Sequence, residues 1–246
     1  MKKIGITGHS GFLGKNLSIE LEKRDSKYTI IPFNKNYFNN DEEMDHFLGQ
    51  CDVVIHLAAV CRSPNPEDVY SVNMLLCTKI LESLDRVGNK PHLLISSSIQ
   101  EEDATPYGKS KKEGRQLMKE WSVRNGAIFT GLIFPNIFGP HCKPYYASFI
   151  ATFCDQLLNN NEPVIQVDRM MNLLFVSDAV DVVLSVIDDS INSEYLRVEP
   201  TDNYKVSEVL TLLKYFKENY IKSGTQPILK NKFEKNLFNV FKTYKL

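Results

Sequence analysis

The sequence predicts an α/β protein, a doubly wound parallel sheet of the Rossmann type followed by a small C-terminal lobe. Over the first 135 residues, short apolar runs alternate with segments of helical periodicity. The apolar runs lack the polar alternation of half-exposed strands, which is typical of parallel strands covered by helices on both faces. Three glycines separate the first apolar run from the first helical pattern, as in folds that bind dinucleotides.

The individual elements follow from these two periodicities. We expect strands over residues 4–7, 28–33, 51–58, 92–98, 127–134 and 173–176. We expect helices over residues 12–23, 69–87, 107–125, 146–159, 178–187 and 208–220. Pro106 suits the first turn of the third helix, and Thr105 is a suitable N-cap for it. We interpret the basic, aromatic segment 230–246 as a helix packed on the small lobe, with a connector to a further domain or a subunit interface as alternatives.

Two domains are expected. Residues 1–135 form the Rossmann domain, and residues 136–246 form the lobe, some elements of which return to the first domain. The boundary is expected at Pro135, because prolines and tyrosines beyond it predict an irregular loop.

Composition excludes several classes of function. The formal net charge of −1 provides no basic excess to attract nucleic acid or an anionic membrane. The five cysteines form no CxxC pair and no metal-ligand cluster, so we expect reduced thiols, no metal and a cytoplasmic protein. The first strand begins at once and no apolar run could span a bilayer, so we expect neither a signal peptide nor a membrane anchor.

The glycine loop is the firmest functional feature. Its glycines, Gly8, Gly11 and Gly14, allow a tight turn, close approach of the backbone to a pyrophosphate, and close packing of the helix. The alternative is an ordinary glycine-rich turn. The predicted cofactor-binding loop comprises Gly8, His9, Ser10, Gly11, Phe12, Leu13 and Gly14.

The end of the second strand bears on the choice of cofactor. An NAD site normally has an acidic residue there that binds the ribose 2′-OH. This chain has Asn34 and Lys35 instead, and the nearest acid is Asp41. An amide beside a cation suits a 2′-phosphate better, so NADP(H) is predicted over NAD(H). The alternative is that Lys35 is an ordinary surface lysine.

A tyrosine and a lysine one helical turn apart form the predicted catalytic pair. Tyr107 and Lys111 share a helix face. A lysine ammonium stabilises a phenolate, so the phenol can donate its proton to a carbonyl oxygen at neutral pH. Three serines end the preceding strand at the edge where such sheets bind ligands. We predict that Ser98 positions the carbonyl, with Ser97 as the second choice. The alternative for the pair is a surface stack of Tyr on Lys.

Together these motifs resemble the extended short-chain dehydrogenase/reductase family, which includes epimerases and dehydratases. Residues 7–14 are similar to its TGxxGxxG motif, 56–59 to HLAA, 107–111 to YGxSK, 136–140 to NxxGP and 175–178 to its late HVxD element. The resemblance implies that Leu57, Ala58, Ala59 and Asn73 also bind the cofactor. It further implies that Lys111 binds the nicotinamide ribose, that the substrate is a nucleotide-linked sugar and that the protein is a homodimer.

Less common strings sharpen this resemblance. Residues 96–100, 142–144, 150–154, 168–169 and 233–237 are similar to the reductase part of the CapF, WbjC and FnlB family of capsule enzymes. That family reduces the 4-keto group of a UDP-2-acetamido-2,6-dideoxy-hexulose with NADPH. Two departures are expected to matter: this chain ends where that family's cupin epimerase domain begins, and Ile133 occupies a position where we expect an arginine.

Several residues are candidates for binding the substrate of such a reductase. Arg62 would face the sugar, Ser98 the ketone, Asn136 a sugar or phosphate oxygen, and Arg169 and Lys143 the diphosphate. For each the alternative is an ordinary surface or loop role. His141 and Cys142 are expected only to line the pocket, and Asp178 to be structural.

Three functional hypotheses remain open. The first is NADPH-dependent reduction of the 4-keto group of a UDP-2-acetamido-2,6-dideoxy-L-hexos-4-ulose. The second is a nucleotide-sugar epimerase or dehydratase with tightly bound NAD. The third is a protein that binds NADP(H) without catalysis.

Overall fold

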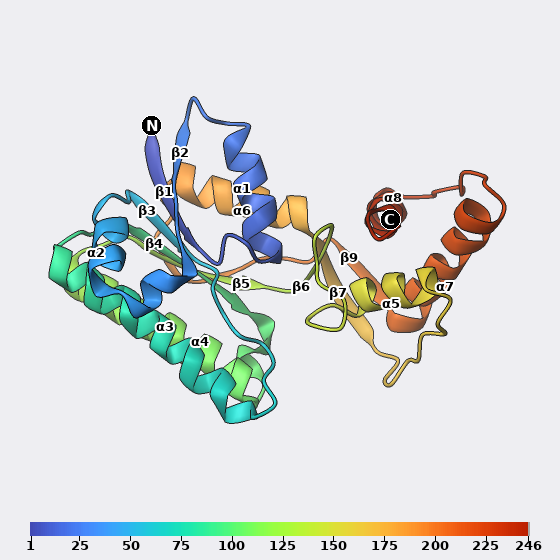
Figure 1. The fold of residues 1–246 in the computed structure, drawn as a ribbon, viewed down its shortest axis with the longest axis horizontal. Helices are drawn as coiled ribbons and strands as arrows, with labels where there is room; N and C mark the ends of the chain where they lie inside the picture. Colours follow the sequence, from blue (N-terminus) through green and yellow to red (C-terminus); the bar gives the residue numbers. More distant parts are fainter. Residues whose placement is uncertain (246) are drawn as a thin grey trace. The chain divides into compact units, whose positions relative to one another are not determined.

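The computed structural model describes residues 1–245, which divide into two compact units (Figure 1). The first unit combines Met1–Phe134 with Val180–Val198. The second combines Pro135–Ala179 with the chain from Glu199 onward.

A parallel sheet of six strands forms the centre of the first unit. Its strands are β1 (Lys2–Thr7), β2 (Tyr28–Ile31), β3 (Val53–His56), β4 (His92–Ser98), β5 (Phe129–Phe134) and β8 (Ser193–Arg197). Their order is β2-β1-β3-β4-β5-β8, and every neighbouring pair is parallel. This order confirms the predicted doubly wound sheet. The order reverses between β1 and β3, and such a switch point is where open α/β sheets bind ligands.

Helices cover both faces of this sheet, which explains why β3 and β5 are buried throughout. Helices α2 (Asp41–Gly49), α3 (Pro66–Val87) and α4 (Pro106–Asn125) pack side by side on one face. The core beneath them includes Phe47, Met118 and Trp121. Helices α1 (Phe12–Glu22) and α6 (Val176–Asp188) lie on the other face (Figure 1).

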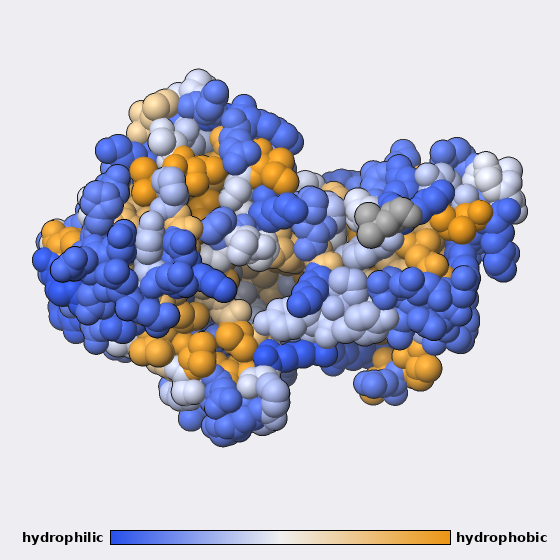
Figure 2. All heavy atoms as spheres, viewed as in Figure 1, coloured by the Kyte–Doolittle hydropathy of each residue, from blue (hydrophilic) through white to orange (hydrophobic). Residues whose placement is uncertain are grey.

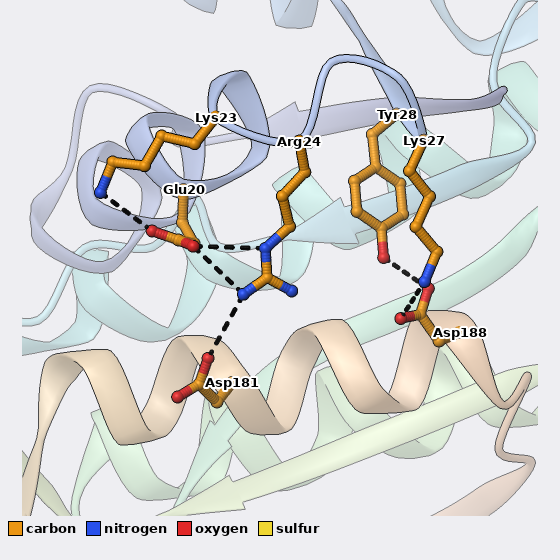
Figure 3. A network of polar contacts seen from close by, with 7 residues as sticks. All are labelled: Glu20, Lys23, Arg24, Lys27, Tyr28, Asp181 and Asp188. Carbon is orange, nitrogen blue, oxygen red and sulfur yellow. Dashed lines mark hydrogen bonds and ion pairs between the residues drawn. The ribbon is translucent and has the colours of Figure 1, made fainter.

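Polar contacts join α1 and β2 to α6 (Figure 3). Arg24 donates to Glu20 at 3.1 and 3.2 Å and lies 3.8 Å from a carboxylate oxygen of Asp181. Asp188, near the end of α6, accepts from Lys27 and from the Tyr28 hydroxyl. Partly exposed ion pairs of this kind contribute little individually to the free energy of folding.

The second unit contains a small mixed sheet and three helices. Its strands are β6 (Asn136–Phe138), β7 (Met170–Phe175) and β9 (Asp202–Lys205), in the order β6-β7-β9. Its helices are α5 (Phe149–Leu158), α7 (Val206–Phe216) and α8 (Lys232–Thr243), and a π-helical turn (η3, Lys217–Lys222) follows α7. Phe233, Leu237 and Phe241 of α8 are buried in the core of this unit. The prediction that the C-terminal segment is a helix packed on the lobe is therefore confirmed.

Hydrophilic residues dominate the face seen in Figure 2, with smaller hydrophobic areas among them. Exposed large apolar side chains include Val123, Val164 and Ile228. Within residues 1–245, no helix has both the length and the apolar character needed to cross a membrane.

Six elements were not predicted from the sequence. They are the 3₁₀ turns η1 (Lys35–Asn39) and η2 (Ile99–Glu102), helix α2 and strands β6, β8 and β9. Three predicted strands are shorter than expected. Strands β3 and β5 each begin two residues later than predicted, at Val53 and Phe129, and the chain leaves the sheet early at Ile31 and at His56. These two early exits occur at the carboxyl edge of the sheet, where the candidate site begins.

Candidate active site

The glycine loop leaves β1 at this edge, and two of its glycines have a clear structural reason. Gly8 has a φ of +79°, and a Cβ there would lie 2.6 Å from the backbone nitrogen of Ala58. At Gly14, a Cβ would lie 2.3 Å from the carbonyl oxygen of Gly8. The loop therefore packs against the segment after β3, and the start of α1 packs against the loop.

Helix α1 presents a free N-terminus at this loop. Its N-cap is Gly11, which has no side chain to accept the first N–H groups, and its first turn contains no acidic residue. The amide of Gly11 itself donates to the Gly8 carbonyl at 3.0 Å. An uncapped, positive helix end without a side chain in the way suits a phosphate group, so the loop fits a dinucleotide pyrophosphate.

A buried hydrogen bond fixes the two strands that flank the switch point. Thr7 Oγ1 and His56 Nδ1 are 2.7 Å apart, and these two residues are direct partners in the β1–β3 register. Burial, together with the nearby Lys111 ammonium, lowers the pKa of His56 to about 3. His56 is therefore neutral, and this pair was missed by sequence reasoning. The signal was present: each of these residues is a polar side chain ending a buried strand at the same edge.

The end of β2 lies next to the glycine loop. The pairing of Gly5 with Ile31 brings the residues after β2 alongside the loop, and the rings of His9 and Phe33 meet edge to face at 6.3 Å. Asn34 accepts from the amide of Asn36 at 3.0 Å and starts η1.

The acidic residue nearest to that strand end is engaged elsewhere. Asp41 lies 3.2 Å from Lys79 and 3.7 Å from Arg86, which are both on α3. Lys35 is exposed. The segment directly after β2 thus carries an amide and a cation but no carboxylate, which fits a phosphorylated ribose better than a bare diol.

Tyr107 and Lys111 lie in the first turns of α4. Thr105 caps this helix by accepting from the Gly108 amide at 3.1 Å, and Pro106 starts it, as predicted. The Lys111 ammonium is 5.9 Å from the centre of the Tyr107 ring. Lys111 is buried, and this burial lowers its pKa. A cation beside a phenol ring is the arrangement that favours the phenolate.

The serines that end β4 differ in their surroundings. Ser97 is buried and donates its hydroxyl to Glu101. Ser98 is half-buried, and its hydroxyl accepts from the Gln100 amide at 3.2 Å, so its hydrogen is available for donation. These surroundings favour Ser98 over Ser97 as the residue that positions a carbonyl.

Asn73 holds the backbone that follows β3. Its amide oxygen accepts from Val60 N at 2.7 Å, and its amide nitrogen donates to Val60 O and to Ser110 Oγ, each at 2.9 Å. Ser110 in turn donates to the Tyr107 carbonyl at 2.8 Å. Asn73 is buried, so it shapes the partly exposed segment of Leu57, Ala58 and Ala59 through the backbone.

The remaining predicted residues are distributed over both units. Arg62 is an exposed residue of the first unit. Asn136, Lys143 and Arg169 belong to the second unit, where Lys143 and Arg169 are exposed and Asn136 donates to Asn172 O at 3.4 Å. Asp178 is paired with Lys232 at 2.9 Å, and its structural role stays a prediction.

The loop that carries Lys143 has strained backbone. His141 has a φ of +69° and Tyr145 a φ of +59°, and such values are uncommon for residues other than glycine. Hydroxyl bonds secure the loop, since Tyr145 donates to Asp155 at 2.7 Å and Tyr244, which follows α8, donates to the Cys142 carbonyl. Strain held in place in this way is typical of loops that bind ligands. Among residues 1–245, no group of three His, Cys, Asp or Glu side chains could hold a metal ion.

Comparison with known proteins assigns the family. Residues 4–196 match the NAD dependent epimerase/dehydratase family. A curated relative, the UDP-2-acetamido-2,6-beta-L-arabino-hexul-4-ose reductase of Pseudomonas aeruginosa, is 28% identical over 221 residues, which cover 88% of this chain and 58% of the relative.

Solved structures agree in fold. The capsular polysaccharide assembling protein CapF from Staphylococcus aureus superposes with a TM-score of 0.80 at 32% identity, over 98% of this chain and 64% of CapF. RMD from Pseudomonas aeruginosa, solved with NADPH, superposes with a TM-score of 0.82 at 18% identity, over 100% of this chain and 99% of RMD. The family match covers most of the chain, and this chain therefore belongs to the NAD-dependent epimerase/dehydratase family.

Proposed function

We propose that the chain is an NADPH-dependent reductase of the 4-keto group of a UDP-2-acetamido-2,6-dideoxy-L-hexos-4-ulose. The observation that carries the proposal is the arrangement at the carboxyl edge of one sheet. Ser98 ends β4 there, Tyr107 and Lys111 begin α4, and the glycine loop follows β1. The activity of the Pseudomonas aeruginosa reductase, which is 28% identical to this chain, supports this choice of substrate.

The cofactor would be held by the glycine loop and by the segment after β3. The N-terminus of α1 binds the pyrophosphate, and Lys35 with Asn34 binds the ribose 2′-phosphate. Lys111 binds the nicotinamide ribose. When bound, the dinucleotide supplies the hydride that reduces the carbonyl carbon.

Three side chains act on the carbonyl oxygen of the substrate. Ser98 donates a hydrogen bond to it and so fixes the carbonyl. Tyr107 donates its proton to the oxygen as negative charge develops there. Lys111 stabilises the resulting phenolate, which is reprotonated from solvent after product release. The proton thus moves from the phenol to the new hydroxyl group.

The diphosphate and sugar of the substrate would be bound by cationic and amide side chains. Arg169 and Lys143 would bind the diphosphate, and Arg62 and Asn136 would bind the sugar. These four assignments are tested by single alanine variants, which should raise the KM for the UDP-sugar more than they lower kcat.

The competing dehydratase function would need a free acidic residue close after Ser98. Ile99 and Gln100 follow it, and the next residue, Glu101, is bound to Arg115 at 2.8 Å through each carboxylate oxygen. Both oxygens of this carboxylate are thus occupied by Arg115, which favours the reductase.

NADPH oxidation with purified isomers of UDP-4-keto-6-deoxy-hexosamine tests the proposal, with product configuration read by NMR. We expect turnover by the wild type, and a loss of at least about 100-fold in kcat for Tyr107→Phe, since positioned proton donors contribute about that much or more. Turnover by Tyr107→Phe at the wild-type rate would falsify the assignment. NADPH binding without oxidation of any isomer would instead favour a non-catalytic role. Light scattering tests the expected homodimer.

A further inference from the structure

A buried ion pair lies beneath the carboxyl end of β4 and has no part in the proton and hydride transfers. Arg115 Nε donates to Glu101 Oε1, and Arg115 Nη2 donates to Glu101 Oε2, both at 2.8 Å. The Arg115 side chain is 6% exposed and that of Glu101 4%. Such a two-pronged pair fixes both groups in one relative orientation.

Neighbouring residues of β5 and β8 accommodate and bind the Arg115 side chain. At Gly131 of β5, a Cβ would lie 2.5 Å from Arg115 Cδ, so the absence of a side chain makes room for the arginine. Arg115 Nη1 donates to the Glu194 carbonyl at 3.2 Å, and its guanidinium lies 5.1 Å from the centre of the Tyr195 ring. The pair therefore ties α4 to β5 and β8 as well as to Glu101.

Stability alone does not explain the pair. Taking two charges out of water is costly, and apolar side chains of similar volume in such places are often as stabilising or more so. A buried ion pair is better explained by specificity. It fixes one relative orientation of the two segments, whereas a purely apolar contact would allow several.

The geometry that this pair secures is that of the catalytic set. Glu101 accepts from Ser97, the neighbour of Ser98, and Arg115 lies one helical turn beyond Lys111. Glu101 itself lies in the short 3₁₀ turn η2 (Ile99–Glu102), which joins β4 to the loop before α4.

Close backbone packing supports the same junction. At Gly108, a Cβ would lie 2.1 Å from the Gln100 carbonyl oxygen, so the first turn of α4 rests directly on η2. The negative charge of Glu101 also acts on the buried Lys111 ammonium and raises its pKa against the effect of burial.

We propose that the Glu101–Arg115 pair is the positioning device that sets Ser98 against Tyr107 and Lys111. The proposal rests on the proposed reductase function and names the residues that give its site a single geometry. Proton transfer requires heavy atoms about 2.6–3.2 Å apart, and a displacement of about 1 Å can cost about 100-fold in rate. The pair acts through Ser97 and the α4 backbone, so neither member touches the reacting atoms.

A double variant separates positioning from stability. Glu101→Met with Arg115→Met removes both charges together, so no uncompensated charge is left in the core. We expect its thermal midpoint and NADPH Kd to stay close to wild type, while kcat falls about 10- to 100-fold. The KM for the UDP-4-keto sugar should change by less than about threefold, because substrate contacts are untouched.

The single variant Glu101→Gln gives a second readout. The charge of Glu101 raises the pKa of Lys111, so removing this carboxylate favours the deprotonated lysine, and the pH profile of kcat should move to lower pH. Lys119→Met is the matched control, since it removes an ion pair to Glu194 from the same helix, at 3.0 Å, without touching Glu101. It should leave kcat and the pH profile unchanged.

The outcomes are distinguishable. No turnover of any isomer by the wild type would overturn both the reductase function and the positioning role. Wild-type turnover with an undiminished kcat in the double variant would overturn the positioning role alone. If the double variant does not fold, Glu101→Gln decides between the outcomes. A kcat profile that moves to lower pH supports the positioning role, and an unchanged profile overturns it.

Discussion

At the scale of single residues, we expect the side chains after β2 to determine which dinucleotide the site prefers. Lys35 is exposed at the strand end, and the nearest acid is held by Lys79 and Arg86. We expect Lys35→Glu to weaken NADPH binding about 10- to 100-fold, the range for losing a hydrogen bond to a charged group. Binding of NADH should be retained or improved, because a carboxylate can accept from the free ribose diol.

Titration of both dinucleotides by fluorescence measures this preference. Lys90→Glu introduces the same change of charge before β4, at the opposite edge of the sheet, and should leave both affinities unchanged. Equal loss of NADPH affinity in the two variants would show that net charge, and not the position of Lys35, is responsible.

The neutral, buried His56 makes stability depend on pH. Its pKa is about 3 in the folded protein, where burial disfavours the charged ring, against 6.5 for a free histidine. Between these values the unfolded chain binds the extra proton, so stability falls as pH falls. From about pH 7.5 to about pH 5 this residue should remove about 2 kcal/mol of unfolding free energy.

Urea unfolding of wild type and His56→Gln at the two pH values tests this. Glutamine is neutral and can still hydrogen-bond to Thr7, so the loss of stability in acid should be smaller by about 2 kcal/mol. His46→Gln, on the exposed side of α2, should leave the acid sensitivity as in wild type. An unchanged acid sensitivity in His56→Gln would contradict the assignment.

At the scale of elements, one buried amide joins the segment after β3 to helix α4. Asn73 satisfies both backbone groups of Val60 and contacts Ser110. We expect Asn73→Ala to cost about 2–4 kcal/mol of unfolding free energy, because each orphaned buried group costs about 1–3 kcal/mol. NADPH affinity should fall as well, since the freed segment is the one against which Gly8 packs.

Ser110→Ala is the matched comparison for this clamp. It removes the bonds to Asn73 and to the Tyr107 carbonyl but leaves Val60 paired, so its effect on NADPH binding should be much smaller. Calorimetry and NADPH titration of both variants provide the measurement. Wild-type NADPH affinity in Asn73→Ala would rule out a role in shaping the cofactor site.

Sequence reasoning found the elements with strong periodicity and missed those without it. The segment 92–98 was predicted with the bounds that β4 has, because it is a continuous apolar run that ends in serines. Strands β8 and β9 were missed because they are short and mostly partly exposed, so packing on their neighbours makes them strands. Helix α2 had a readable start in Asn40 followed by three acids, which cap and charge its first turn.

The candidate site was predictable to a similar degree. Local spacing was enough to identify Tyr107 and Lys111, because residues four apart share a helix face. The Glu101–Arg115 pair and the Thr7–His56 bond were not predictable in that way, since they join segments whose contact depends on the tertiary fold. The choice between Ser97 and Ser98 could not be made from the sequence, because the two are adjacent and identical in type. The structure distinguishes them, since Ser97 is buried and bonded to Glu101 and Ser98 is half-buried.

At the scale of the whole molecule, each of the two units has hydrophobic core residues of its own. The core of the first unit includes Trp121, the single tryptophan, whose indole donates to Asp85 at 2.7 Å. The core of the second unit includes Leu213 and the aromatic side chains of α7 and α8. Helix α6 is continuous between the units, with Ala179 in the second and Val180 in the first.

Separate cores predict separable effects of mutation. Leu213→Ala should cost about 2–5 kcal/mol, as for other fully buried leucines. Far-UV circular dichroism reports both units, whereas tryptophan fluorescence reports the first unit alone. We expect Leu213→Ala to lower the urea midpoint seen by dichroism more than the midpoint seen by fluorescence. Leu94→Ala, at an equally buried leucine of β4, should lower the fluorescence midpoint by the larger amount. Equal shifts of both signals in both variants would instead mean that the two units unfold as one cooperative structure, with α6 transmitting the loss.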